Sequence, residues 1–190
     1  MKKINTYITE KLKLNKDSCE KYNYYPKNKN ELIEIVTELI KKRGKNADLN
    51  DIDVSEITDM SELFYKININ KININNIDIS EWDVSNVHTA YNMFYGCTNF
   101  NCDLSNWDVS NLVTAPRMFY GCESFNSDLS KWNVSKLRSA QGMFSDCFEL
   151  DCDFENWNLD KHTVNIGQMF FHCHALRNNK KIPEWYPYVF

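Results

Sequence analysis

Hydrophobic residues recur every 25 residues through the second half of the chain and predict an array of similar units. Tryptophan marks the period at Trp82, Trp107, Trp132 and Trp157, and a valine or leucine follows each one by two positions. Phenylalanine and cysteine keep the same period, with one extra residue in the last unit, at Phe94, Phe119, Phe144 and Phe170 and at Cys97, Cys122, Cys147 and Cys173. One unit cannot bury its apolar face alone. We therefore expect copies to stack from about Asp53 to Leu176.

A helical period occupies one half of each unit. Val87, Ala90, Phe94 and Cys97 advance by three, four and three positions, which predicts one face of a short helix over about 90–96. Proline is tolerated in a first helical turn, and Pro116 fits that place. The position before each expected helix holds a residue type that favours an N-cap, at Asp59, Thr89, Thr114, Ser139 and Asn165.

An alternating period occupies the other half. From Phe100 to Leu112 apolar and polar residues alternate, which predicts a short strand that includes Trp107 and Val109. Each unit is therefore expected to be a strand, a tight turn and a short helix. Gly96 and Gly121 suit a left-handed turn at the end of that helix.

The unit F-N-x-D-L-S-x-W-D-V-S-N-x-x-x-x-x-x-M-F-Y-G-C resembles the BspA-like leucine-rich repeats of the bacterial-surface or mycoplasma-lipoprotein type, which are built on WDVSN and MF motifs. The resemblance covers residues 53–176. It implies a right-handed, leucine-rich-repeat-like solenoid, binding or adhesive roles, and no catalytic residues to transfer. The expected fold is thus an α/β repeat solenoid of about four to five strand-turn-short-helix coils with a helical N-terminal cap.

The two ends differ from the array and from each other. Residues 1–52 are expected to form a basic helical cap, since Asn30 to Arg43 places Leu32, Val36 and Leu39 on one stripe and Gly44 would end the helix. Residues 53–176 are the predicted repeat array. Residues 177–190 are strongly aromatic and are interpreted as a C-terminal cap or, alternatively, as a docking tail.

Charge and composition narrow the function classes. The chain has 190 residues and a net charge of −4, but residues 1–50 carry net +5 and residues 51–190 net −9. An acidic array repels nucleic acid and anionic membranes and attracts basic proteins. The start of the chain lacks the apolar run of a signal peptide, and no segment has the roughly 18 apolar residues of a membrane span. We expect a cytoplasmic protein, in the host cytoplasm if its origin is viral.

Acidic residues share columns in the stacked units. One column is expected to hold Asp103, Asp128 and Asp153, and a second to hold Asp83 and Asp108, followed by Asn133 and Asn158. Turn chemistry explains such columns, because Asp and Asn bond their own backbone. A basic protein partner and calcium are the alternatives, although a calcium site needs six or more oxygen ligands.

Cysteine and tryptophan are interpreted as architecture. The four periodic cysteines lie on the expected inner face and should be buried thiols, while Cys102, Ser127 and Cys152 share a column predicted to be polar or at the surface. The tryptophans should be core, with each indole N–H in need of an acceptor, and an exposed stacking platform is the alternative. The sequence holds neither a Cys-x-x-Cys pair nor a phosphate-binding or nucleophile motif, so we expect no metal, no cofactor and no enzyme activity.

The predicted function is a non-catalytic protein-protein interaction module that uses an acidic face, in one version to inhibit a nucleic-acid-binding or host-defence enzyme. The alternative is a bacterial surface or adhesion protein. Oligomeric state is left open. The candidate partner-binding residues are Tyr91, Tyr95, Arg117, Tyr120, Gln141 and Asp146, together with Asp103, Asp128 and Asp153.

Overall fold

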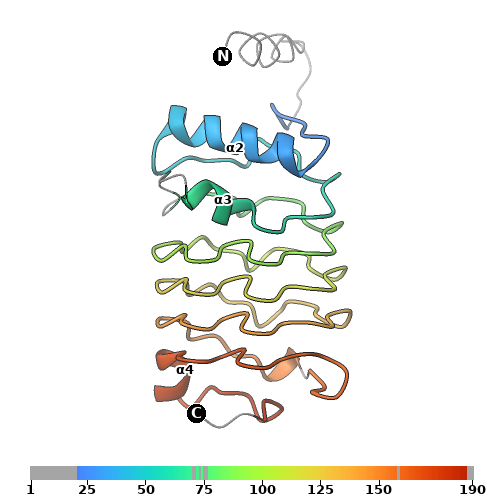
Figure 1. Cartoon of the computed structure of the whole chain (residues 1–190), viewed down its shortest axis with the longest axis vertical. Helices are drawn as coiled ribbons and strands as arrows, with labels where there is room; N and C mark the ends of the chain where they lie inside the picture. Colours follow the sequence, from blue (N-terminus) through green and yellow to red (C-terminus); the bar gives the residue numbers. More distant parts are fainter. Residues whose placement is uncertain (1–20, 70–71, 73, 75–76, 158, 188–190) are drawn as a thin grey trace.

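The chain forms a stack of coils, one above another in sequence order (Figure 1). The computed structural model describes residues 21–69, 72, 74, 77–157 and 159–187, so Asn158 and parts of both predicted ends lie outside the described residues. Helix α2 (Lys29–Arg43) lies across one end of the stack. The other helical segments are short: α3 (Leu63–Ile69), the 3-10 helix η1 (Glu155–Trp157) and α4 (His174–Asn178).

The predicted α/β solenoid of strand-turn-short-helix coils is wrong. The described part of the chain contains no β-sheet, and the segments equivalent to 90–96 form turns, except where α3 occupies that place in the first coil. The residues expected to cap helices instead form isolated parallel bridges between successive coils, in the order Asp59, Thr89, Thr114, Ser139 and Asn165.

Two left-handed residues in each central coil explain the missing helix. In one coil φ is 52° at Asn92 and 68° at Gly96, and a right-handed helix cannot contain either conformation. The backbone amides bond the next coil instead, as the amide of Phe94 does to the carbonyl of Met118 at 2.8 Å. Side chains three and four positions apart still point inward, so the turns reproduce the hydrophobic spacing of a helix.

Rows of aromatic rings fill the interior. The ring centroids of Phe94 and Phe119 are 5.2 Å apart, and those of Phe119 and Phe144 are 5.5 Å apart, with nearly parallel planes. The tryptophan row is buried, as predicted, and Trp132 Nε1 donates to the carbonyl of Leu104 at 3.0 Å. The same bond to an earlier coil recurs at Trp82, Trp107, Trp157 and Trp185. Each coil is therefore fixed to its neighbour by ring packing and by an indole hydrogen bond.

Buried cysteines complete the interior. The four periodic cysteines are each at most 2 % exposed, which confirms their interpretation as buried thiols. Burial raises their pKa, that of Cys173 to about 12, so these thiols stay protonated. Of the predicted polar or surface position of Cys102, Ser127 and Cys152, the surface alternative is wrong, because all three are buried. In two coils this column supplies an acceptor: Ser127 Oγ takes the amide of Leu104, and Cys152 Sγ takes that of Leu129.

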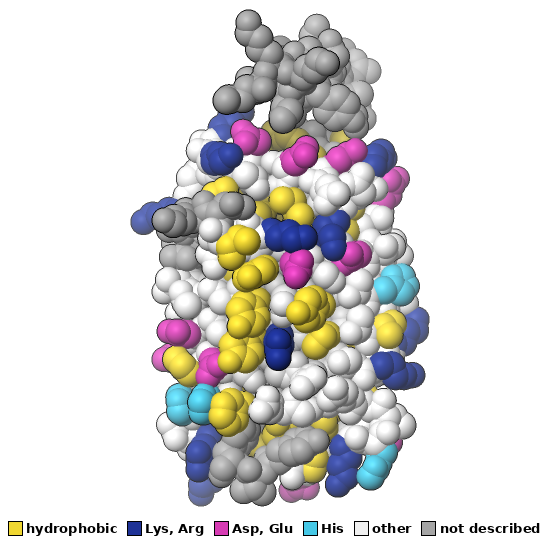
Figure 2. Space-filling view, viewed as in Figure 1, with side chains coloured by type: hydrophobic (Ala, Val, Ile, Leu, Met, Phe, Trp, Pro, Cys, Tyr) yellow, Lys and Arg dark blue, Asp and Glu magenta, His cyan; other side chains and the backbone are white. Residues whose placement is uncertain are grey.

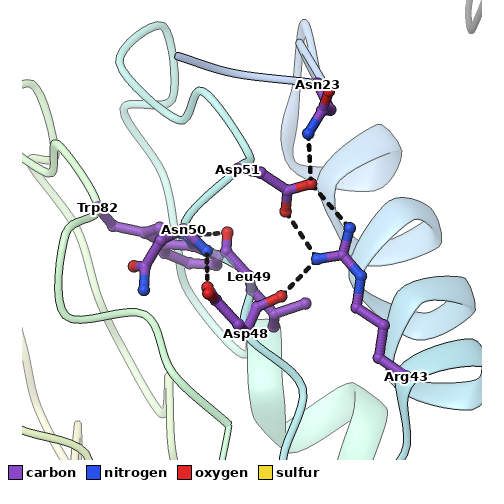
Figure 3. A network of polar contacts seen from close by, with 7 residues as sticks. All are labelled: Asn23, Arg43, Asp48, Leu49, Asn50, Asp51 and Trp82. Atoms are coloured by element: carbon purple, nitrogen blue, oxygen red, sulfur yellow. Dashed lines mark hydrogen bonds and ion pairs between the residues drawn. The ribbon is translucent and has the colours of Figure 1, made fainter.

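Helix α2 is joined to the first coil by a polar network (Figure 3). The helix coincides with the predicted one, buries Leu32, Val36, Leu39 and Ile40, and ends at Gly44. The last residue of the helix, Arg43, donates to both carboxylate oxygens of Asp51 at 2.7 Å and to the carbonyl of Asp48. Burial would raise the pKa of Asp51, but hydrogen bonds from Arg43 and Asn23 lower it.

Candidate protein-binding surfaces

One surface of the stack carries tyrosines in a ladder. The tyrosine face is defined here as Tyr65, Tyr91, Tyr95, Arg117 and Tyr120. The rings of Tyr95 and Tyr120 stack with centroids 5.0 Å apart and planes at 8°, and Tyr65 meets Tyr95 edge to face at 5.6 Å. Tyr91 is 38 % exposed. Figure 2 shows hydrophobic side chains, tyrosine included, gathered along the middle of one face of the stack.

Arg117 is exposed in the turn that carries Tyr120. Its φ is 55°, a left-handed value that costs a residue with a side chain about 1–2 kcal/mol. Its amide donates to the carbonyl of Gln141 in the next coil at 2.9 Å. A methyl group built on Gly142 would lie 3.5 Å from Arg117 Cγ and 3.9 Å from Tyr120 Cδ2, so the arginine chain runs over Gly142 beside the tyrosine ring.

Acidic residues at the border of this face have partners. A hydrogen bond to Asp146 raises the pKa of Tyr120, and Asp146 Oδ1 also lies 2.8 Å from His172 Nδ1. Glu62 pairs with Lys66 at 3.2 Å, and Asp59 pairs with Lys29.

A second surface carries the acidic row, defined here as Asp103, Asp128 and Asp153. The Oδ1 atom of each accepts the backbone amide two residues later, at 2.9, 3.0 and 2.9 Å, which confirms the predicted turn chemistry. The hydrogen bonds from Ser105 and Ser130 lower the pKa of Asp103 and Asp128, so both are ionised at neutral pH. A shallow open hollow beside them is lined by Asn101, Asp103, Ser105, Asn106, Asn126, Ser127, Asp128 and Lys131.

The nine candidate residues thus fall into two groups. Tyr91, Tyr95, Arg117, Tyr120, Gln141 and Asp146 come from the turns that bond coil to coil, and the acidic row comes from the turns after Phe100 and its equivalents. Two further residues belong with the first group and were missed. Tyr65 occupies the position of Tyr95 in an earlier coil, which the alignment of Phe64 with Phe94 could have revealed. His172 occupies the position of Asp146 in the next coil, so the same period could have indicated their contact.

The described residues contain no group of three or more His, Cys, Asp or Glu side chains placed to hold a metal ion. No helix within the same residues is long and apolar enough to span a membrane.

A sequence comparison found one family. The model of a family described as "Mycoplasma protein of unknown function, DUF285" matches residues 34–78 and 67–185. Comparisons with curated proteins and with solved structures gave no match.

Proposed function

This chain belongs to the DUF285 family of Mycoplasma proteins of unknown function, and we propose that it is a non-catalytic module that binds a basic protein through the acidic row. The observation that carries the proposal is the state of the three carboxylates. Each has Oδ1 held by a turn amide, and each side chain is exposed. The turn bond fixes the side chain, and the exposed carboxylate is available to a ligand.

Ionisation and position strengthen this proposal. Asp103 and Asp128 are kept charged by their turn hydrogen bonds, and they belong to a segment of net charge −9. A fixed row of negative charge raises the association rate of a positively charged partner and favours lysine and arginine at the interface. The partner we propose is therefore a protein with a basic surface.

An inhibitor is the more specific version. Carboxylates can occupy the places of phosphates on a nucleic-acid-binding protein, so a chain with this row would compete with nucleic acid for such a partner. The proposed compartment for this activity is the cytoplasm, or the host cytoplasm for a viral chain.

The test replaces all three aspartates by asparagine. Asparagine keeps the acceptor for the turn amide, as Asn133 does for Ser135 at 3.2 Å in a neighbouring column, and removes only the charge. Proteins captured from host lysate by the wild-type chain at low salt should be lost with the triple variant and at high salt. Nucleic acid should displace them if the inhibitor version holds. Capture that is insensitive to both salt and the triple variant would rule out the acidic row as the binding site.

A bacterial surface or adhesive role is the alternative, and the resemblance to repeats of the bacterial-surface type favours it. Fractionation of the native organism, followed by protease treatment of intact cells, separates the two. A protein degraded on intact cells would support the surface role, and a protected protein in the cytoplasmic fraction would support the proposal above.

A further inference from the structure

The tyrosine face has a charge that the fold leaves uncompensated. The neighbouring acids Glu62, Asp59 and Asp146 all have partners. By contrast, the guanidinium of Arg117 has neither an ion pair nor a hydrogen bond within the described residues. The segment around it is acidic overall, so a single unpaired arginine is a local exception and offers bidentate binding to a carboxylate.

The aromatic geometry selects the kind of ligand. Tyr95 and Tyr120 stack on each other, so their ring faces are largely used and their edges are presented outward. Bases and sugars bind to aromatic faces, whereas peptide groups pack well against the edges and hydroxyl groups of tyrosines. Tyrosine and arginine are also the residues most enriched at the energetic centres of protein interfaces.

We infer that the tyrosine face is a second binding site, which takes an extended peptide segment with an acidic side chain. The carboxylate pairs with Arg117, and apolar groups of the peptide pack along Tyr95 and Tyr120. This site is separate from the acidic row, and it selects ligands of the opposite charge.

Selection of short random peptides against the full chain tests the inference. Peptides that bind should be richer in Asp and Glu than the starting library. The Arg117→Glu variant should bind these peptides with an affinity lower by about tenfold or more. The matched control is Gln168→Glu, which places the same negatively charged side chain at the equivalent left-handed position two coils away and should leave binding unchanged. A second variant, Tyr120→Ser, uses the residue that stands at the equivalent position 145 and should also weaken binding.

Thermal unfolding of each variant separates loss of binding from loss of fold. Selected peptides without acidic enrichment, or peptides that bind Arg117→Glu as well as wild type, would overturn the inference. Binding of an oligothymidine that Arg117→Glu abolishes would overturn it too, because the face would then recognise phosphate. Enrichment of Lys and Arg in peptides that are lost with the triple asparagine variant would contradict this site and support the acidic row alone.

Discussion

The interior of the coils and the tyrosine face follow the same 25-residue spacing, but the side chains of the interior stay nearly constant from coil to coil, whereas those of the face change. The interior repeats nearly the same side chain in every coil, as at Phe94, Phe119 and Phe144, whereas the face changes from the half-buried Tyr95 and Tyr120 to Ser145, which is buried and donates to the carbonyl of Gln168. Ring stacking between coils requires equal partners, and the positions of the face tolerate different side chains. The constant positions thus maintain the stack, and the variable ones are free to define what it binds.

The sharpest test of this contrast is Phe119→Ala, which should destabilise the protein by about 3–5 kcal/mol. The ring contacts Phe94, Phe125, Trp132 and Phe144 from three coils, so truncation leaves a cavity that spans the stack. Denaturant unfolding measures the loss. Tyr120→Ser, one residue along, is the matched control and should cost less than about 1 kcal/mol; equal losses would abolish the distinction between interior and face.

Trp132→Phe tests the indole hydrogen bond within the same interior. The variant keeps an aromatic ring but leaves the carbonyl of Leu104 without its donor, and we expect a loss of about 2–3 kcal/mol. The comparison variant is Phe125→Leu, which replaces a buried ring that makes no hydrogen bond. It should lower the free energy of unfolding by less than Trp132→Phe does. If the two variants unfold at the same denaturant concentration, the indole bonds add nothing to ring packing.

The sequence predicted the stacked rows because spacing along the chain reports which side chains face inward. It identified the phenylalanine, tryptophan and periodic cysteine rows, the turn bonds of Asp103, Asp128 and Asp153, and helix α2. It failed on secondary structure for a physical reason. Turns with left-handed residues at Asn92 and Arg117 reproduce the three- and four-residue spacing of a helix. Asparagine favours that conformation only weakly and arginine does not favour it, so neither residue type indicates it as clearly as glycine does.

Surface geometry was only partly predictable. The ladder of Tyr95 and Tyr120 followed from the period, but the isolation of Arg117 depends on which neighbouring acids find other partners. The buried column of Cys102, Ser127 and Cys152 was misjudged because polar composition suggests exposure, although two of its members accept amides of an adjacent coil.

A polar contact at the end of the stack should matter less than the interior. Asp51→Asn removes the charge paired with Arg43 and should cost about 1 kcal/mol at neutral pH. The pKa of Asp51 is lowered in the folded state, so its contribution is complete above the unfolded pKa and is lost as the pH falls through the folded value. The stability gap between wild type and variant should therefore close in acid. Glu38→Gln, in an exposed pair with Lys41, is the control and should show almost no gap at any pH.

The smallest expected effect has the opposite sign and concerns Arg117 itself. Glycine adopts φ of 55° without steric strain, so Arg117→Gly removes about 1–2 kcal/mol of backbone strain from the folded state. Part of this gain is offset because glycine gives the unfolded chain more conformational entropy. The variant also loses the packing of the arginine chain over Gly142, and we expect a net gain of about 0.5 kcal/mol. Calorimetry on Arg117→Gly and Gln168→Gly, which share the conformation, measures the gain at both positions. If Arg117→Gly is as stable as wild type or more so and yet no longer binds acidic peptides, the strained arginine is retained for recognition at the expense of stability, as expected of a functional residue on the variable face. A clear loss of stability would instead make Arg117 part of the architecture, together with the rows beneath it.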